Sequence, residues 1–217
     1  WDRAGRVVGG WLSVSSPALD PGVGANPSLR PTRVGKSSTA APANIAFIKY
    51  WGARDLARAL PANASISMTL SACVSRTTVE AFEAVGRDEI LLAAEDGSLS
   101  EAPESFSRRA LAQLSTLRQA TGFNGSFRVA TRNSFPISAG IASSASGFTA
   151  LTAATLASRG VEVDPPTLSR LTRASGSASA ARSVLGGYVG FPGGGDHAAP
   201  GAFPPPPAAP RAPSSPH

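Results

Sequence analysis

The sequence predicts an α+β fold. Along the middle of the 217-residue chain, short apolar runs typical of strands alternate with segments whose apolar residues recur at helical spacing. Strand patterns both precede and follow the first helical pattern. The motif-bearing part, about 150 residues, is long enough to bury on the order of 70% of its unfolded surface, so a hydrophobic core is expected.

Each element follows from a local pattern. The expected strands cover residues 44–51, 65–72, 75–82, 89–93, 126–131 and 187–191. A helix is expected after Pro103, where apolar residues recur at helical spacing: Phe106, Ala110, Leu111, Leu114 and Leu117. A second helix is expected over residues 144–158, with Phe148, Leu151 and Leu156 on its buried side. A third begins near Pro165 and a short fourth near Ser177.

Composition divides the chain into three parts. Residues 1–40 are rich in Gly, Ser, Pro and Arg without a usable period, which favours a linker, a spurious upstream extension or a transit peptide. Residues 192–217 are dominated by Pro, Gly and Ala and lack the apolar content that would offset the entropy cost of ordering, so disorder is expected. Residues 41–191 are expected to form the folded domain.

Charge and rare residues narrow the function classes. The net charge is +6, but no stripe of basic residues interleaved with aromatics is present, so anionic small molecules are expected as partners and nucleic acid is not. The single cysteine excludes an internal disulfide framework and suits a reducing, cytoplasmic compartment. Two histidines make a His-based metal site implausible. No apolar run is long enough to cross a membrane.

The segment Phe-Pro-Ile-Ser-Ala-Gly-Ile-Ala-Ser-Ser-Ala-Ser-Gly, residues 135–147, precedes the second expected helix. A helix that begins there directs free N–H groups and a partial positive charge at a ligand, and serine hydroxyls can contact phosphate oxygens or Mg²⁺. The segment therefore predicts a phosphate cradle, with a flexible loop and a capped helix as the alternative. A Walker-type loop is rejected because Arg30 stands where the leading glycine before Gly35-Lys36-Ser37 belongs.

Four further segments accompany this loop. Residues 41–52 read Ala-Pro-Ala-Asn-Ile-Ala-Phe-Ile-Lys-Tyr-Trp-Gly, and residues 60–67 read Leu-Pro-Ala-Asn-Ala-Ser-Ile-Ser. Residues 176–183 read Gly-Ser-Ala-Ser-Ala-Ala-Arg-Ser, followed by Leu-Gly-Gly-Tyr-Val at 185–189. In this order the segments resemble the diphosphomevalonate decarboxylases of the GHMP kinase superfamily, from about Ala41 to Phe191.

The resemblance implies the N-terminal domain of that superfamily, a twisted sheet with helices on one face similar to the second domain of ribosomal protein S5, without the C-terminal domain. It implies ATP and Mg²⁺ as cofactors, mevalonate 5-diphosphate as substrate, isopentenyl diphosphate as product and a possible homodimer. A sister enzyme, such as mevalonate 3-kinase or phosphomevalonate decarboxylase, and a non-catalytic anion-binding remnant remain alternatives.

The resemblance also assigns roles to residues. Lys49 contacts the anionic groups of the substrate, Arg182 binds its carboxylate and Asn44 holds Arg182 in position. The implied substrate-binding set is Lys49, Tyr50, Trp51, Ser177, Ser179 and Arg182. The implied ATP-binding set is Ser138, Gly140, Ala142, Ser143, Ser144 and Ala145, with Ser144 also expected to bind Mg²⁺.

Structural roles are open for several of these residues. Lys49 could be a solvated lysine at a strand edge, Trp51 a core residue and Arg182 a surface arginine. Strand alternation places Tyr50 and Lys49 on opposite faces, so these two side chains share a ligand only if the strand bends near Gly52.

The chain also departs from the family. It lacks the Asp-Ala-Gly-Pro-like motif that carries the general-base aspartate, and Ala53 replaces a lysine. Phosphoryl transfer requires a carboxylate to orient or deprotonate the accepting hydroxyl. We therefore expect a truncated form with little or no decarboxylase activity.

Overall fold

The computed structural model describes residues 13–15, 33–49, 52–55, 60–136, 143–174, 177–192 and 201–203. The strands are β1 (Ser13–Ser15), β2 (Arg33–Ile48), β3 (Ala53–Asp55), β4 (Leu60–Pro61), β5 (Ser65–Phe82), β6 (Glu89–Ala93), β7 (Leu99–Glu101), β8 (Ser126–Asn133), β9 (Tyr188–Phe191) and β10 (Gly201–Phe203). The helices are α1 (Glu104–Thr121), α2 (Ser143–Ser158), α3 (Pro165–Arg173) and α4 (Ala178–Arg182). The expected α+β class is confirmed.

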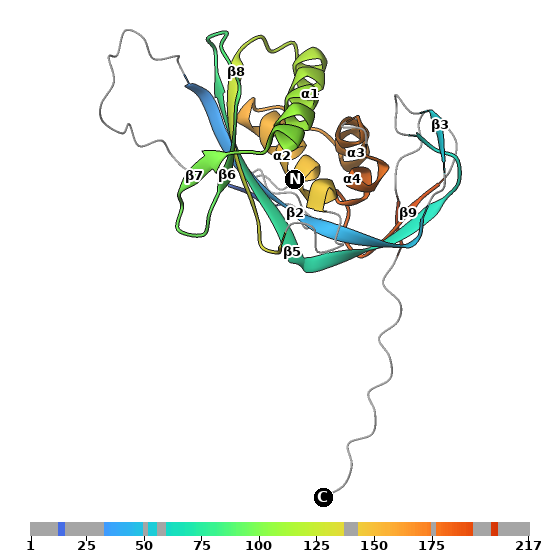
Figure 1. Ribbon diagram of the computed structural model, residues 1–217. Coiled ribbons are helices and arrows are strands. Elements are labelled where there is room, and N and C mark those ends of the chain that lie inside the picture. Colours follow the sequence, from blue (N-terminus) through green and yellow to red (C-terminus); the bar gives the residue numbers. More distant parts are fainter. Residues whose placement is uncertain are drawn as a thin grey trace, which may run out of the picture.

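The main sheet has eight strands in the order β1-β2-β5-β8-β6-β7, with β9 paired to β5 and β10 to β9. Its pairs are antiparallel except β6 and β8, which run parallel. Strands β3 and β4 form a separate two-stranded sheet. Figure 1 shows the helices together on one face of the main sheet. We call the other face the open face.

Strand β2 begins at Arg33, well before the expected start at residue 44. Residues 33–40, predicted to belong to a disordered extension, instead pair with the second half of β5, and β1 pairs with Ser38–Ala40. The prediction was wrong because small residues fill the buried face of this segment: Ser37, Thr39 and Ala41. Such residues give no hydrophobic alternation for a sequence pattern to reveal.

Strand β5 is continuous, whereas the sequence suggested two strands separated near Cys73. At the predicted break, the pairing of β5 with β2 is irregular. Pro42 pairs with Val74, whereas the next residue, Ala43, pairs with Leu70. Three residues of β5 therefore have no partner in β2. The first half of β5 pairs with β9 and the second half with β8.

The core lies between the sheet and the helices. The largest buried side chains include Phe127 on β8 and Phe148 on α2, together with Leu114 and Leu117 on α1. Leu111, one of the apolar residues whose spacing predicted α1, is exposed. Helix α2 is buried around almost its whole circumference, not only on the predicted stripe.

Helix ends follow local chemistry. The carboxylate of Asp164 accepts the backbone N–H of Thr167 at 2.7 Å and so caps α3. Hydrogen bonds from the side chain and backbone of Thr167 lower the pKa of Asp164. Helix α1 ends at Gly122, whose φ of 68° is the left-handed conformation that favours glycine.

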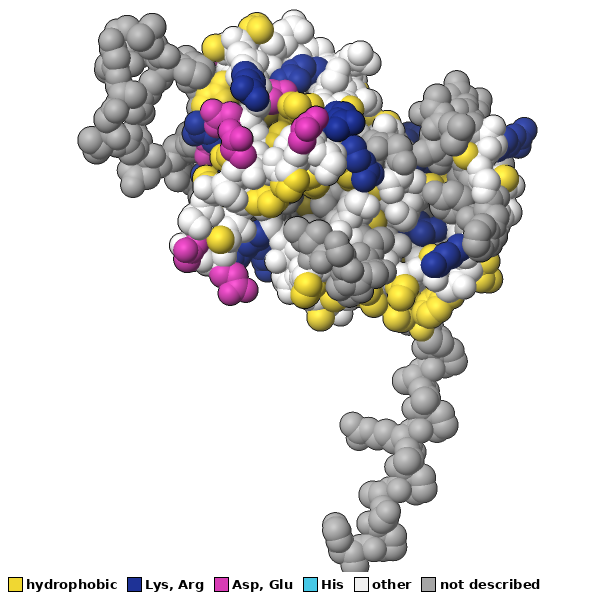
Figure 2. Space-filling model, in the orientation of Figure 1, with side chains coloured by type: hydrophobic (Ala, Val, Ile, Leu, Met, Phe, Trp, Pro, Cys, Tyr) yellow, Lys and Arg dark blue, Asp and Glu magenta, His cyan; other side chains and the backbone are white. Residues whose placement is uncertain are grey.

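Strand β10 corrects the second disorder prediction. Its three residues, Gly201–Phe203, lie in the tail expected to form no sheet, yet they pair with β9. Nearby, the end of β2 leaves apolar side chains exposed, and Phe47 (59% exposed) stacks on Tyr188 with ring centroids 6.2 Å apart. Figure 2 shows hydrophobic side chains gathered along the lower edge of the molecule. No helix among the described residues is long and apolar enough to cross a membrane.

We predict that Gly35→Ala destabilises the fold by about 2 kcal/mol, because overpacking against an immovable neighbour costs that much. A Cβ at Gly35 would lie 2.1 Å from the backbone oxygen of Ser158, at the end of α2. Urea denaturation measures the effect. The control is Gly86→Ala, whose Cβ would meet nothing closer than 3.4 Å. Equal losses in the two variants would contradict the close approach of β2 to α2.

Candidate functional site

The first turn of α2 is fixed to the sheet by a chain of side-chain hydrogen bonds. The hydroxyl of Ser75 on β5 donates to Oδ1 of Asn133 on β8 at 2.6 Å and lies 2.6 Å from the hydroxyl of Ser146. Ser143 and Ser144 come one turn earlier and are half-buried. The start of α2, with its free N–H groups, therefore has a defined position.

The structure describes only part of the predicted ATP-binding set. Ser143 and Ser144 lie at the helix start as expected. Ala145 is fully buried and its side chain packs in the hydrophobic core. Ser138, Gly140 and Ala142 lie outside the described residues.

A pocket of about 420 Å³ opens beside Ser143 and Ser144. Its walls come from the ends of β6 and β8 and from the starts of α1 and α2: Leu92, Ala93, Ala94, Glu95, Pro103, Ser105, Phe106, Thr131, Arg132, Asn133, Phe135, Ser143, Ser144 and Gly147. Apolar side chains such as Leu92, Phe106 and Phe135 alternate in this lining with polar and charged ones. This composition is typical of a small-molecule site.

Helix α4 holds Arg182 in a buried position. Only 3% of Arg182 is exposed, and its Nη1 donates to the hydroxyl of Ser65 on β5. The alternative of a surface arginine is therefore wrong. A buried guanidinium is retained where hydrogen bonds or an anion satisfy it.

Asn44 on β2 anchors α4. Its amide donates to the backbone oxygen of Ser179 at 3.0 Å and to the hydroxyl of Ser183 at 2.8 Å. Asn44 therefore fixes the residues on either side of Arg182.

Two further hydroxyls, one on α2 and one on α3, bind α4 by hydrogen bonds. Thr149 of α2 donates to the backbone oxygen of Ala180 at 2.8 Å, and Ser169 of α3 donates to that of Ala181 at 3.0 Å. The half-buried hydroxyls of Ser177 and Ser179 lie 2.9 Å apart at the start of the helix. Such paired hydroxyls can reorient to donate to an oxyanion.

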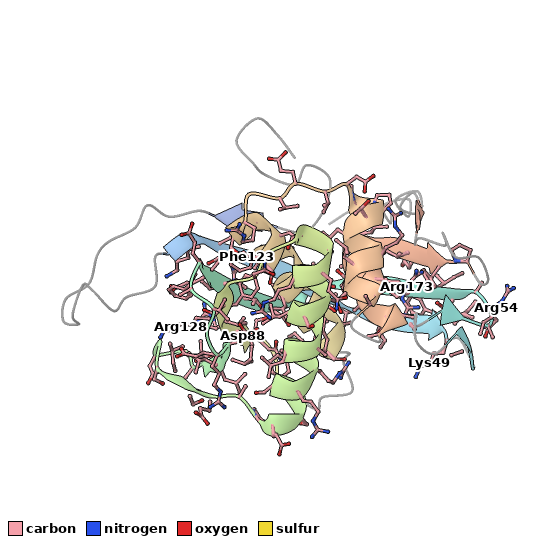
Figure 3. The ribbon with its side chains drawn as sticks, turned by 90° about the horizontal axis from the view of Figure 1, so that it is seen from above. Lys49, Arg54, Asp88, Phe123, Arg128 and Arg173 are labelled. Carbon is pink, nitrogen blue, oxygen red and sulfur yellow. The ribbon has the colours of Figure 1, made fainter. Side chains whose placement is uncertain are left out.

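Lys49 is exposed at the end of β2. Since Ile48 pairs with Ile66 in an antiparallel ladder, Lys49 follows it to the level of Ser65, the partner of Arg182. The register shifts between Ala46 and Ile48, so strict alternation fails there. Figure 3 shows Lys49 near Arg54, at the opposite end of the molecule from Arg128. Tyr50 and Trp51 lie outside the described residues.

The pocket beside Ser143 and the residues around Arg182 both adjoin the N-terminal half of α2. At about 1.5 Å of rise per residue, Thr149, which contacts α4, is about 9 Å along the helix from Ser143. We call Arg182, Ser65, Ser177 and Ser179 the Arg182 cluster. The pocket and the Arg182 cluster are therefore neighbours. Among the described residues, no group of three or more His, Cys, Asp or Glu side chains could hold a metal ion.

The family named "Diphosphomevalonate decarboxylase-like N-terminal domain" matches residues 41–200. The chain belongs to this family. The match agrees with the segment expected from the motifs, and it extends nine residues beyond Phe191 to residue 200.

Curated diphosphomevalonate decarboxylases are similar to this family member. The protein from Aspergillus fumigatus is 39% identical over 170 residues, which cover 72% of this chain and 41% of the relative. The protein from Saccharomyces cerevisiae is 38% identical over 163 residues, which cover 71% of this chain and 41% of the relative. The chain thus spans about two fifths of the length of these relatives.

Solved structures give the same fold. A structure described as MDDEF in complex with MVAPP, AMPPCP and magnesium matches with a TM-score of 0.70 and 34% identity, over 78% of this chain and 51% of that one. Mevalonate diphosphate decarboxylase from Trypanosoma brucei matches with a TM-score of 0.64 and 34% identity, over 78% of this chain and 46% of that one. The expected GHMP-type N-terminal domain is confirmed.

Several residues of this decarboxylase-like domain escaped the sequence analysis. Ser65, Ser75 and Asn133 position the site through contacts between residues far apart in the chain. Ser65 lies in the segment 60–67, and Ser75 begins the second of two expected strands. Neither position indicates in the sequence that Ser65 contacts Arg182 or that Ser75 contacts Asn133. Phe106 was predicted only as a core residue, and it also lines the pocket.

We predict that Asn44→Ala lowers the free energy of unfolding by about 2 kcal/mol, because it removes two hydrogen bonds and leaves the backbone oxygen of Ser179 without its donor. Chemical denaturation measures the loss. Asn124→Ala, which truncates an exposed amide, is the control and should change stability by less than about 0.5 kcal/mol. A similar small change in both variants would refute the anchoring role of Asn44.

Proposed function

We propose that this chain supplies the nucleotide- and substrate-binding half of a diphosphomevalonate decarboxylase, which uses ATP and Mg²⁺ to convert mevalonate 5-diphosphate into isopentenyl diphosphate. The observation that carries the proposal is the proximity of two sites along α2. The pocket lies at the helix start, and Thr149 joins the helix to the Arg182 cluster.

The pocket suits a nucleotide. Its apolar walls, which include Phe106 and Phe135, offer a surface for a flat base, and the start of α2 offers N–H groups to phosphates. Ser143 and Ser144 would hold phosphate oxygens, and the Ser144 hydroxyl would also bind Mg²⁺, a cation that prefers oxygen ligands. A structural neighbour was solved with AMPPCP and magnesium, which supports this assignment.

The Arg182 cluster suits a compact polyanion. A guanidinium binds a carboxylate through two parallel hydrogen bonds, and Arg182 is held ready for this by Ser65 and α4. The hydroxyls of Ser177 and Ser179 would hold the diphosphate, with the Lys49 ammonium at the rim. Desolvated donors of this kind stabilise charge more strongly than donors in water.

In the proposed reaction, the tertiary hydroxyl of the substrate attacks the γ-phosphorus of ATP and ADP leaves. The new phosphate then departs with the C–O bonding electrons, while the C–C bond to the carboxylate breaks to form carbon dioxide and the alkene. A carboxylate would accept the hydroxyl proton. Ser65 contacts Arg182, and Asn44 anchors the helix that carries it, so this chain would bind and align the two anions.

We predict that Gly147→Leu abolishes ATP binding without loss of the fold. Gly147 lines the pocket and is buried, yet a Cβ there would meet no atom within 4 Å, so a larger side chain enters the open space of the pocket. Calorimetric titration with Mg·AMPPCP measures the affinity, and Gly147→Ala should give a smaller loss. The nucleotide assignment fails if Gly147→Leu, folded by circular dichroism, still binds with unchanged affinity.

We predict that the double variant Ser177→Ala/Ser179→Ala weakens binding of mevalonate 5-diphosphate at least tenfold, since charge-assisted hydrogen bonds contribute about 1.5–3 kcal/mol each. The loss should be much smaller for mevalonate 5-phosphate, which we expect to bind less tightly to the unmodified chain. Ser100→Ala, on the exposed strand β7, is the control. Equal affinity of the unmodified chain for both substrates would contradict the diphosphate assignment.

A further inference from the structure

The open face of the sheet carries charged residues in cross-strand rows. In one row, Lys36, Glu80 and Arg128 are directly paired across β2, β5 and β8, and Glu89 of β6 continues the row. Opposite charges alternate along it. Lys36 forms an ion pair with Glu80 at 2.9 Å and Arg128 with Glu89 at 2.5 Å. This arrangement satisfies each basic group within the protein.

A second row breaks this rule. Four residues along the same strands, Ala40, Arg76 and Arg132 are directly paired, and Ala93 of β6 lines the same hollow. The backbones of directly paired residues lie about 5 Å apart, so two side chains of like charge are neighbours, with Ala40 as the next residue in the row. Within the described part of the chain, neither guanidinium has an ion pair, a hydrogen bond or an aromatic partner. No acid balances this row.

The two arginines border a hollow of about 210 Å³. Its floor consists of small side chains, Ala40, Ala93 and Ala130, and of the hydroxyls of Ser38 and Thr78, which lie 2.7 Å apart across the strands. Both arginines are exposed, so their side chains can turn over the hollow. Two donors of fixed charge and two hydroxyls thus surround a space of the size of a small oxyanion.

We propose that this hollow is a second anion site, and that it binds a compact phosphate-bearing anion between Arg76 and Arg132. The physical reason is the uncompensated like-charge pair, which an oxyanion converts from a repulsion into two bidentate contacts. The site lies on the open face, whereas the proposed nucleotide pocket lies between the strand ends and the helices; the two share only Ala93 and Arg132 in their walls. It does not depend on the proposed decarboxylase function.

Titration with inorganic pyrophosphate, followed by heteronuclear NMR of the full chain, tests the proposal at individual residues. The backbone amides of Ser38, Thr78 and Ala130 and the Nε–H groups of Arg76 and Arg132 should shift and saturate together. The same shifts should persist in Gly147→Leu and in Ser177→Ala/Ser179→Ala, which impair the two proposed catalytic sites. Loss of the shifts in either variant would assign the anion to those sites and overturn the proposal.

A charge-matched pair of variants completes the test. Arg76→Gln/Arg132→Gln should weaken pyrophosphate binding at the hollow at least tenfold, whereas Arg87→Gln/Arg108→Gln removes two exposed arginines elsewhere and should leave it unchanged. If both double variants weakened pyrophosphate binding equally, the effect would come from net charge alone, and the proposed site would be refuted. Malonate provides a dicarboxylate comparison: tighter binding of malonate than of phosphate would refute the phosphate class.

Discussion

The near-complete burial of α2 is the constraint on which the rest of the structure depends. A helix enclosed on all sides leaves little room, so its residues are mostly Ala, Ser, Thr and Gly. Its buried hydroxyls need partners, and several find them within the helix, as when Thr152 donates to the backbone oxygen of Phe148 and Ser158 to that of Thr155. Gly35 on β2 lets the backbone approach the end of this helix at a distance that a side chain would prevent.

This central helix also determines where chemistry can occur. Because α2 is packed along its length, its first turn is the part that can meet a ligand, and Ser75 and Asn133 fix that turn to the sheet. The same helix holds α4 through Thr149, while Asn44 holds α4 from the strand side. The two proposed binding sites therefore share one rigid support, which favours alignment of their ligands over independent binding.

The sequence was informative where a pattern is local and uninformative where a contact is distant. The helices over residues 143–158 and 165–173 follow from apolar period, proline and capping residues, and the motifs led to Arg182 and Asn44. The first part of β2 was missed because Ser37 and Thr39 are buried small polar residues with no hydrophobic period. The partnership of Arg182 with Ser65 joins residues 117 positions apart, a contact that no local rule predicts.

The irregularity in β5 explains why the two sites lie next to each other. Strands β8 and β9 pair with β5 on the same side, one after the other, and the two ladders leave residues 69–74 of β5 between them. Ser134 bonds the backbone of Val74 on one side of this gap, and Gly187 bonds that of Thr69 on the other. The end of β8, which precedes the serine-rich segment 135–147, therefore lies across this gap from Gly187, which follows α4. The register shift therefore brings two motifs that are distant in sequence to the two ends of one short gap.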